Sequence, residues 1–411
     1  MTTKTLLSIA LAFALGGTAS AARFESELAF ERDANDLVPT TLVAAKAALA
    51  PGMHLESQPV HFSWALPADQ KIEAQQPFVR DSKEYWTRVP GAELARGTTL
   101  RTTAKGALIR LSPVSGDAKA VQPISADDVV ITAQGKALQG RAAMANAAND
   151  AELKMAGTDF PDGTLAFQLR DDLGAGAITL ALPKAAGDYL VHVYEPNSSE
   201  VLKLTMDRIV ASHGQAYKVF AAYNGHEALD SIDGLVSTPN GATVELAFKR
   251  AADGRYVAEV AHDALAGAGP GLWEVHAFAS AKGATVQRDA KTAFASSIPR
   301  ARLAGGVKSL REDDGSLSMQ FTLKVAAESR FEVRGTLYGM DGGKLRPAAQ
   351  ASTAAMLKPG DGMLTLVFDA DTLAKAGISG PYQLRDLTLV DQSDLSTVEL
   401  RRAGLRIAPD R

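Results

Sequence analysis

The chain contains no cysteine. This absence excludes disulfide bonds, a lipid anchor on an N-terminal cysteine, a thiolate metal site and a cysteine nucleophile. Each folded unit must therefore be stabilised by its own hydrophobic core, which favours domains of about 100 residues or more. The length of 411 residues accommodates about two to four such domains.

Basic clusters and long apolar runs are also scarce. The formal net charge is -4, and Arg300, Arg302 and Lys308 form only a sparse basic stretch, which we interpret as a solvated linker. Binding to a nucleic-acid backbone needs clustered Lys and Arg, so we expect no nucleic-acid partner. No second long apolar run follows the N-terminal one, so no membrane anchor is expected.

The first 21 residues have the order of an export signal. Lys4 precedes an apolar run, Thr5–Leu15, and the small residues Ala19-Ser20-Ala21 follow it. The run is shorter than the roughly 20 residues that span a bilayer, and this order is typical of a cleaved signal peptide. We predict that residues 1–21 are removed, that the mature chain begins at Ala22, and that the protein is periplasmic or secreted.

Alternating apolar residues and turn signals predict a mainly β chain with few helices. Residues 98–111 indicate two strands around Lys105-Gly106, and residues 129–132 indicate a third, closed by Gln134-Gly135. Helices are expected over residues 39–50 and over residues 138–156, a stretch rich in Ala, Asn and Met. Asp-Gly or Asn-Gly dipeptides favour hairpin turns because they tolerate positive φ. They stand between apolar runs at residues 162–163, 240–241, 253–254, 314–315, 341–342 and 361–362.

Three segments share one order of features, in which an alternating strand is followed by a glycine-containing turn and a strand led by an aromatic residue. The leading aromatics are Tyr189, Trp273 and Tyr382. We expect each to face inward from a late sandwich strand and to pack against the opposite sheet. The repeat places boundaries near residues 205–209 and 298–300. The predicted organisation is a signal peptide (1–21), an N-terminal arm (22–60), an N-terminal β-rich domain (61–205) and two immunoglobulin-like β-sandwiches (206–299 and 300–411).

Some of these residues carry a family resemblance. GLWEVHAF (271–278), with Gln287-Arg288-Asp289 downstream, and GPYQLRDLTL (380–389) resemble the immunoglobulin-like modules of exported bacterial proteins. The stretch from SKEYW (82–86) to ALIRL (107–111) is similar to the first domain of a family of uncharacterised proteins secreted by gammaproteobacteria. This resemblance implies an N-terminal β domain followed by immunoglobulin-like domains, and it implies no catalytic residues.

Signatures of catalysis are missing. The chain has no G-x-S-x-G elbow, no H-E-x-x-H pair and no P-loop. In the nearest match to a zinc motif, His226-Glu227, Asp230 stands where the second histidine would be. We therefore name no catalytic, cofactor-binding or metal-binding residue, and we expect no cofactor.

Two histidines and two acidic loops could still carry a site. His192 and His276 lie three residues after their aromatics, so they are either recurring ligand or pH-sensitive positions or half-exposed strand residues. The acidic loops at 312–315 and 391–394 either contribute calcium ligands or are solvated hairpin tips. We favour the second interpretation in both cases.

An aromatic-rich stretch offers a further candidate. It contains Phe62, Trp64, Phe78, Tyr85 and Trp86. If exposed, these rings could form a sugar-stacking or partner-binding platform. We favour core packing, because aromatics make up only 6% of the chain and the sandwiches need several of them.

These observations predict an exported, non-catalytic protein that binds a protein or glycan at the cell surface or outside the cell. The alternative is a secreted hydrolase with its active site in the N-terminal domain and accessory sandwiches, and a third hypothesis is a structural periplasmic component. A cleft with converging polar groups in the N-terminal domain would favour the hydrolase. An exposed apolar or aromatic patch would favour the binding protein.

Overall fold

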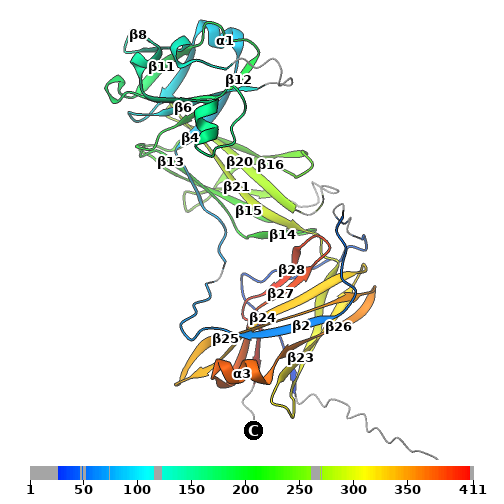
Figure 1. Ribbon diagram of the computed structural model, residues 1–411. Helices are drawn as coiled ribbons and strands as arrows, with labels where there is room; N and C mark the ends of the chain where they lie inside the picture. The colour runs from blue at the N-terminus through cyan, green and yellow to red at the C-terminus, as the bar shows by residue number, and fades with distance from the viewer. Residues whose placement is uncertain are drawn as a thin grey trace, which may run out of the picture.

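A computed structural model describes residues 26–46, 49, 52–73, 75–114, 123–260, 269 and 271–407. The predicted signal peptide and its cleavage site lie outside the described residues. The fold is mainly β with few short helices, as predicted. Three domains, each built of two sheets, follow one another along an elongated molecule (Figure 1).

The N-terminal domain encloses its core between a five-stranded sheet of order β4-β12-β6-β10-β9 and a four-stranded sheet of order β5-β11-β7-β8. Tyr85, Phe167 and Tyr189 are among the buried residues between them. The elements are β4 (Glu84–Pro90), α1 (Gly91–Arg96), β5 (Thr98–Thr102), β6 (Leu108–Val114), η2 (Ala126–Asp128), β7 (Val130–Ala133), β8 (Lys136–Gln139), η3 (Gly140–Ala143), β9 (Met144–Asn149), α2 (Asp150–Met155), β10 (Leu165–Leu169), η4 (Asp171–Leu173), β11 (Gly176–Ala181) and β12 (Asp188–Tyr194).

In this domain the predicted strands are confirmed and the predicted helix is largely wrong. β5 and β6 flank Lys105-Gly106, and β7 ends before the turn at Gln134-Gly135. Residues 138–156, predicted as one helix, form the end of β8, η3, β9 and only the short α2. β9 pairs with β10 from Asn149 to Met144, so pairing within the sheet overrides the helix propensity of its alanines. Helix α2 begins at a capping box between Asn149 and Glu152.

The middle domain is formed by two five-stranded sheets, of order β18-β19-β15-β13-β3 and β14-β21-β20-β16-β17. Trp273 lies fully buried between them, with Tyr217 and Phe294 nearby. The elements are β3 (Arg80–Ser82), β13 (Val201–Met206), β14 (Val210–Ser212), β15 (Tyr217–Asn224), β16 (Leu229–Ser237), β17 (Thr243–Ala247), β18 (Lys249–Arg250), β19 (Tyr256–Val260), β20 (Gly271–Ala281) and β21 (Val286–Ser297).

The C-terminal domain is completed by the beginning of the chain. Its four-stranded sheet has the order β1-β22-β23-β26, and its six-stranded sheet has the order β2-β25-β24-β27-β28, with β29 paired to β27. In Figure 1 the blue strand β2 lies along the orange and yellow strands of this domain. The elements are β1 (Ser26–Leu28), β2 (Val60–Ala65), β22 (Ala301–Arg311), β23 (Leu317–Val325), β24 (Ser329–Asp341), β25 (Lys344–Leu357), β26 (Gly360–Phe368), α3 (Ala370–Ala376), β27 (Ser379–Asp391), β28 (Ser396–Arg401) and β29 (Leu405–Ile407).

These pairings correct the predicted domain ranges. Residues 60–65 were assigned to the N-terminal arm and domain, but they pair with β25 at the edge of the C-terminal sheet. β3 and β13 were also assigned to the N-terminal domain, but they pair with each other in the middle domain. The reason is that strand pairing joins segments far apart in sequence, which a linear pattern of turns and strands does not reveal.

The arm does not contain the helix predicted over residues 39–50, because described residues 39–46 and 49 are not helical. Its backbone bonds to other segments instead. Leu37 forms a bridge with Leu400, the Val43 N–H donates to the Pro299 carbonyl at 2.9 Å, and the Ala45 carbonyl accepts from Arg300 at 2.7 Å. The arm therefore lies across the junction between the middle and C-terminal domains.

Most of the predicted turn dipeptides occupy turns. Those at 240–241, 253–254, 314–315 and 341–342 join consecutive antiparallel strands, and Asp162-Gly163 forms the turn before β10. Asp361-Gly362 lies inside β26, because Lys358 and Pro359 make the connection between β25 and this strand.

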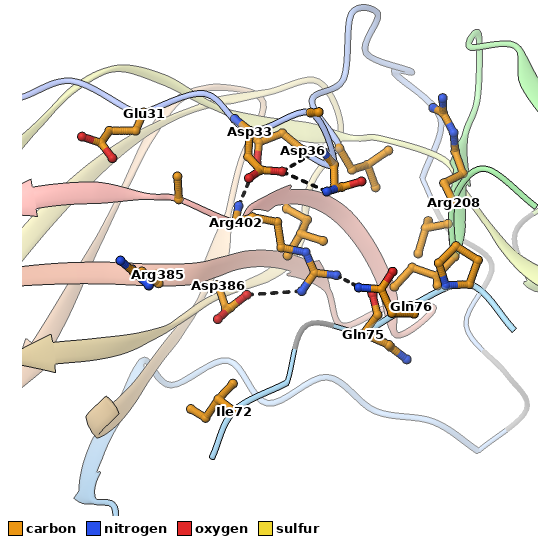
Figure 2. Close-up of a pocket in the computed structure, with 18 of the residues that line it drawn as sticks. Glu31, Asp33, Asp36, Ile72, Gln75, Gln76, Arg208, Arg385, Asp386 and Arg402 are labelled. Atoms are coloured by element: carbon orange, nitrogen blue, oxygen red, sulfur yellow. Dashed lines mark hydrogen bonds and ion pairs between the residues drawn. The ribbon is translucent and has the colours of Figure 1, made fainter. Parts of the chain in front are cut away.

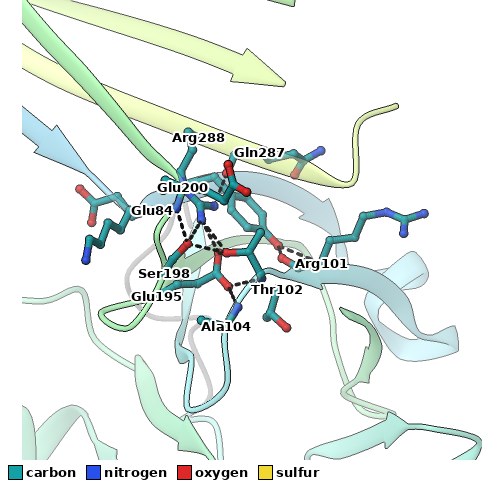
Figure 3. Close-up of polar contacts among 12 residues, drawn as sticks. Glu84, Arg101, Thr102, Ala104, Glu195, Ser198, Glu200, Gln287 and Arg288 are labelled. Carbon is teal, nitrogen blue, oxygen red and sulfur yellow. Dashed lines mark hydrogen bonds and ion pairs between the residues drawn. The ribbon is translucent and has the colours of Figure 1, made fainter. Parts of the chain in front are cut away.

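The N-terminal and middle domains are locked together by Arg288 on β21, which is 1% exposed. Its guanidinium forms an ion pair with Glu195 at 2.8 Å and donates to Thr103 Oγ1 and Ser198 Oγ, each at 2.8 Å. Figure 3 shows Glu195 and Ser198, from the segment after β12, converging on Arg288. A buried charge with this many partners fixes one relative orientation of the two domains.

Candidate functional site

A cleft of about 520 Å³ lies where the arm, the linker that precedes β3, the middle domain and the C-terminal domain meet. A second hollow of about 420 Å³ shares Ile72, Asp386 and Arg402 with it and continues across the outer face of the six-stranded sheet. We call the two hollows together the seam groove. The cleft is larger than the other hollows that we describe, including one of about 280 Å³ in the N-terminal domain.

Arg402 holds the walls of the groove together, as Figure 2 shows. Its backbone N–H donates to Asp36 of the arm at 2.7 Å. Its guanidinium donates to Asp386 of β27 at 3.2 Å and to the Gln75 carbonyl of the linker at 3.1 Å. One residue thus connects three segments that are far apart in sequence.

A β-bulge directs two consecutive polar residues into the groove. The register between β24 and β27 shifts between Arg334/Thr388 and Thr336/Arg385, so β27 carries one extra residue there. Asp386 adopts a φ of 49° at this point, a left-handed conformation that aspartate tolerates better than most residues. Arg385 and Asp386 both line the cleft as a result, instead of alternating between the two faces of the sheet.

Arg385 is held in place by a ring and an amide. Its guanidinium carbon lies 4.8 Å from the centroid of the Tyr338 ring, and its Nε donates to Gln383 Oε1 at 2.9 Å. No ion pair of Arg385 with a carboxylate is present among the described residues. Other charges of the groove are already paired within it, such as Arg208 with Asp207 at 2.9 Å and Arg402 with Asp386 at 3.2 Å.

The floor of the second hollow is a row of polar side chains on the outer face of the sheet. Arg334 and Thr336 on β24 and Gln350 on β25 line it. The Gln350 amide donates to Thr336 Oγ1 at 3.2 Å, and Arg334 donates to Glu332 at 2.8 Å. Gln350 pairs in register with Trp64 of β2, so the row ends at the edge strand.

Two aromatic rings stand exposed at that edge. Phe62 is 53% exposed and Trp64 is 38% exposed, and their ring centroids are 5.6 Å apart. They lie on one face of β2 because residues two apart on a strand point the same way. Ser63 points to the other face, where its hydroxyl donates to Asp369 at 2.7 Å. The sequence interpretation of Phe62 and Trp64 as core residues is therefore wrong.

Two family models match the chain. The DUF4785 N-terminal domain, described as a domain of unknown function, matches residues 51–195, and the DUF4785 C-terminal domain matches residues 300–408. Together they cover more than half of the chain. The chain belongs to the DUF4785 family. Among curated protein sequences, none matches it.

Two solved structures have been compared with the fold of this DUF4785 protein. The crystal structure of a DUF4785 family protein from Legionella pneumophila matches with a TM-score of 0.72 and 21% identity, over 90% of this chain and 99% of that chain. Trypsin-activated alpha-2-macroglobulin from Escherichia coli matches with a TM-score of 0.22 and 13% identity, over 74% of this chain and 22% of that one. The first likeness shows a shared architecture, and the second is too low to describe one.

The two repeat histidines of the DUF4785 protein converge at the junction between its N-terminal and middle domains. Trp86 stacks on His192 with ring centroids 4.9 Å apart, and it meets His276 edge-on at 5.6 Å. Both histidines are only partly exposed and face this junction, so the interpretation as simple half-exposed strand positions is incomplete. Burial lowers the pKa of His276 to about 4, and Lys291 adds to this effect.

Asp289 lies at the same junction. Its carboxylate accepts the Trp86 backbone N–H at 2.7 Å. Burial raises the pKa of Asp289 to about 7, against the lowering effect of this hydrogen bond, and the Glu84 charge raises it further. Burial also opposes ionisation of Glu84, but hydrogen bonds from His192 and Arg80 outweigh it and keep the pKa of Glu84 below its ordinary value.

The remaining candidates have structural surroundings. The acidic residues of 312–315 form the turn between β22 and β23. In the loop at 391–394, Asp391 and Asp394 pair with the buried Arg300 at 3.1 Å and 2.7 Å, so neither a solvated hairpin tip nor a solvated linker is present there. His226 lies in a turn and pairs with Glu200 at 2.8 Å.

The other members of the aromatic-rich stretch differ in burial. Phe78 is 62% exposed and Tyr85 is 2% exposed, so core packing holds for Tyr85 and fails for Phe78.

Across the described residues, no group of three or more His, Asp or Glu side chains is arranged to hold a metal ion. No described helix is long and apolar enough to cross a membrane.

Sequence reasoning missed Arg385, Asp386 and Arg402 as groove residues. The adjacent polar pair inside the apolar strand of residues 380–389 was the available signal, because two consecutive polar residues break the alternation of a strand.

Proposed function

We propose that this DUF4785 protein is an exported, non-catalytic binding protein of gammaproteobacterial type, and that it binds a component of the cell envelope in the seam groove. The ordering of a charged residue, an apolar run and small residues at the N-terminus supports export to the periplasm or beyond. The resemblance of the chain to secreted proteins supports the same location.

The observation that carries the binding proposal is the position of Arg385 and Asp386. A bulge aims both into the largest hollow that we describe, and Arg385 keeps donors that no carboxylate of the described residues occupies. Local irregularity of this kind concentrates at binding sites because it re-aims side chains at some cost in pairing. The hydrolase alternative gains less support, because this groove lies outside the N-terminal domain.

Co-sedimentation with isolated Gram-negative cell envelopes tests the proposal. The variants Arg385→Gln and Asp386→Asn remove the groove charges, and Asn keeps the left-handed backbone that position 386 requires. Arg255→Gln serves as the matched control, since Arg255 pairs with Asp253 on the surface of the middle domain. We expect wild type and control to sediment with envelopes and both groove variants to lose about tenfold in affinity. Equal binding by all four proteins would refute the groove as the binding site.

Export has its own test. Fractionation of expressing cells should place the protein in the periplasm or the medium, and N-terminal sequencing should begin at Ala22 or close to it. A cytoplasmic protein that retains residues 1–15 would contradict this part of the proposal.

A further inference from the structure

We propose that the ligand of the seam groove is a linear, uncharged glycan chain that lies across the strands of the C-terminal sheet and ends against Phe62 and Trp64. This inference rests on the binding function proposed above and names the chemical class of its ligand. Three features of the groove carry it, namely its length, its balance of charge and the rings at its end.

The groove is long and runs across the strands. Arg385 and Asp386 lie on β27, Thr336 on β24, Gln350 on β25 and Trp64 on β2, and these four strands are consecutive in the sheet. Neighbouring strands are about 4.8 Å apart, so the row extends over about 14 Å. A row of this length suits a chain of several similar units better than a single small molecule.

Apart from Arg385, several arginines of the groove are paired with carboxylates before any ligand arrives. Arg402 pairs with Asp386, Arg334 with Glu332 at 2.8 Å and Arg406 with Glu31 at 2.5 Å. Arg385 can meet one negative charge, but a ligand with several charges would have to break such pairs and leave one partner without its counter-charge. An uncharged ligand with many hydroxyl groups can instead add hydrogen bonds to them.

The side chains between the charges suit hydroxyl groups. Gln350, Thr336 and Thr388 line the second hollow, and amides and hydroxyls both donate and accept hydrogen bonds. A pocket for an apolar ligand is lined mainly by hydrophobic and aromatic side chains, whereas this row is polar along the sheet. Sugar hydroxyls have the same dual character, so each can bond to a neighbouring pair of such side chains.

The exposed rings complete the match. Phe62 and Trp64 stand at the edge strand in register with Ser352 and Gln350. Aromatic rings are large and rigid, and a ring that is partly exposed in the free protein gains favourable contacts when a ligand covers it. The C–H face of a sugar ring is a flat apolar surface that can cover such a ring while its hydroxyls bond to the polar row.

Tryptophan fluorescence tests the inference on the full mature chain. Of the three tryptophans, Trp273 is fully buried and Trp64 is 38% exposed, so contact of a ligand with the groove should change the emission of Trp64. The probes are linear, uncharged oligosaccharides of chitin, cellulose and the α-1,4-glucans, each from dimer to hexamer. We expect at least one series to bind with affinity that rises about tenfold or more with chain length.

Variants locate the contact. Measured by isothermal titration calorimetry, Trp64→Ala should lower the affinity for the hexamer by roughly tenfold or more, since one tenfold step corresponds to about 1.4 kcal/mol. Tyr194→Ala is the matched control, because Tyr194 is a similarly exposed aromatic (37%) on the N-terminal domain. It should bind as wild type does. Unchanged binding by Trp64→Ala would overturn the placement of the glycan.

Failure of the inference is distinguishable from failure of the proposed function. If none of the three series binds, or if an extended peptide binds in the groove instead, the glycan assignment is overturned. The binding function still stands in that case, provided that Arg385→Gln still lowers the affinity for envelopes by about tenfold. If Arg385→Gln sediments as wild type does, the proposed function falls as well.

Discussion

Arg288 of the middle domain forms an ion pair with Glu195 at the end of the N-terminal domain, with 2.8 Å between nitrogen and oxygen and both side chains at most 1% exposed. Glu195 also accepts the backbone N–H of Ala104 at 3.0 Å. The pair therefore links the turn between β5 and β6, the segment after β12 and strand β21. Removal of one partner would leave the other charged, buried and without its counter-charge.

We predict that Arg288→Met lowers the free energy of unfolding by about 3–5 kcal/mol, the usual cost of breaking a buried pair. Arg88→Met is the control, because Arg88 pairs with Asp188 on the surface, where its side chain is 64% exposed. Such exposed pairs contribute about 0–1 kcal/mol. Urea unfolding of the full mature chain measures both. Equal stability of Arg288→Met and Arg88→Met would contradict the locking role of Arg288.

Trp273 offers a test of the middle core. Its side chain is fully buried and its ring lies 5.8 Å from that of Phe294. Trp273→Ala should lose the transfer free energy of the ring and leave a cavity, at a cost of about 3–5 kcal/mol. Trp64→Ala should leave the melting temperature nearly unchanged, because Trp64 is exposed. Thermal unfolding followed by circular dichroism compares the two, and a matching loss in both variants would refute this contrast.

At the junction between the N-terminal and middle domains, Asp289 and His276 should contribute to stability with opposite pH dependences. The pKa of Asp289 is raised to about 7, so the folded state binds its proton more tightly than the unfolded state does. Its contribution to stability is complete below about pH 4 and is lost as the pH rises through about 7. The pKa of His276 is lowered to about 4, so its contribution is complete above about pH 6.5 and is lost as the pH falls through about 4.

Single variants separate these contributions. Between pH 5 and pH 8 the two contributions offset each other in wild type, since they change the free energy of unfolding in opposite directions. In Asp289→Asn the stability should rise over this range relative to wild type, because only the histidine contribution remains. In His276→Gln it should fall relative to wild type. Urea unfolding at both pH values measures the differences, and parallel pH profiles for all three proteins would be inconsistent with the shifted pKa values.

The C-terminal domain should depend on the start of the mature chain. β1 and β2 form the edges of its two sheets, and Arg300 connects the Ala45 carbonyl to Asp391 and Asp394. We predict that a fragment beginning at Arg302 melts without a cooperative transition, whereas a fragment of residues 26–66 linked to residues 298–407 melts cooperatively. Circular dichroism decides between them. A cooperative melt of the shorter fragment would show that the two N-terminal strands are dispensable.

Much of the local structure could be predicted from the sequence. Tyr189, Trp273 and Tyr382 are all buried, as their place after a glycine turn indicates, and hairpins form at Asn240-Gly241 and Asp341-Gly342. These features depend on residues that are close in sequence. Turn chemistry and period-two burial act locally, so a single sequence reports them.

The features that could not be predicted from the sequence depend on contacts between residues far apart in the chain. The alanines of β9 form a strand because β10 pairs with them. Phe62 and Trp64 are exposed because β2 is an edge strand of the C-terminal sheet, and the burial of Arg300 depends on Asp391, about ninety residues away. The groove itself is assembled from Asp36, Gln75 and Arg402, and no spacing along the chain indicates that these residues meet.

The most direct measurement of the binding claim is photo-crosslinking from the groove to cell envelopes. A crosslinking residue placed at Gln350 lies on the floor of the groove, and one placed at Met155, which is 82% exposed on the N-terminal domain, is the control. The account predicts that envelope material is captured from position 350 and not from position 155, and that Arg385→Gln abolishes the capture. Capture from position 155 alone, or capture from position 350 that Arg385→Gln leaves unchanged, would contradict it.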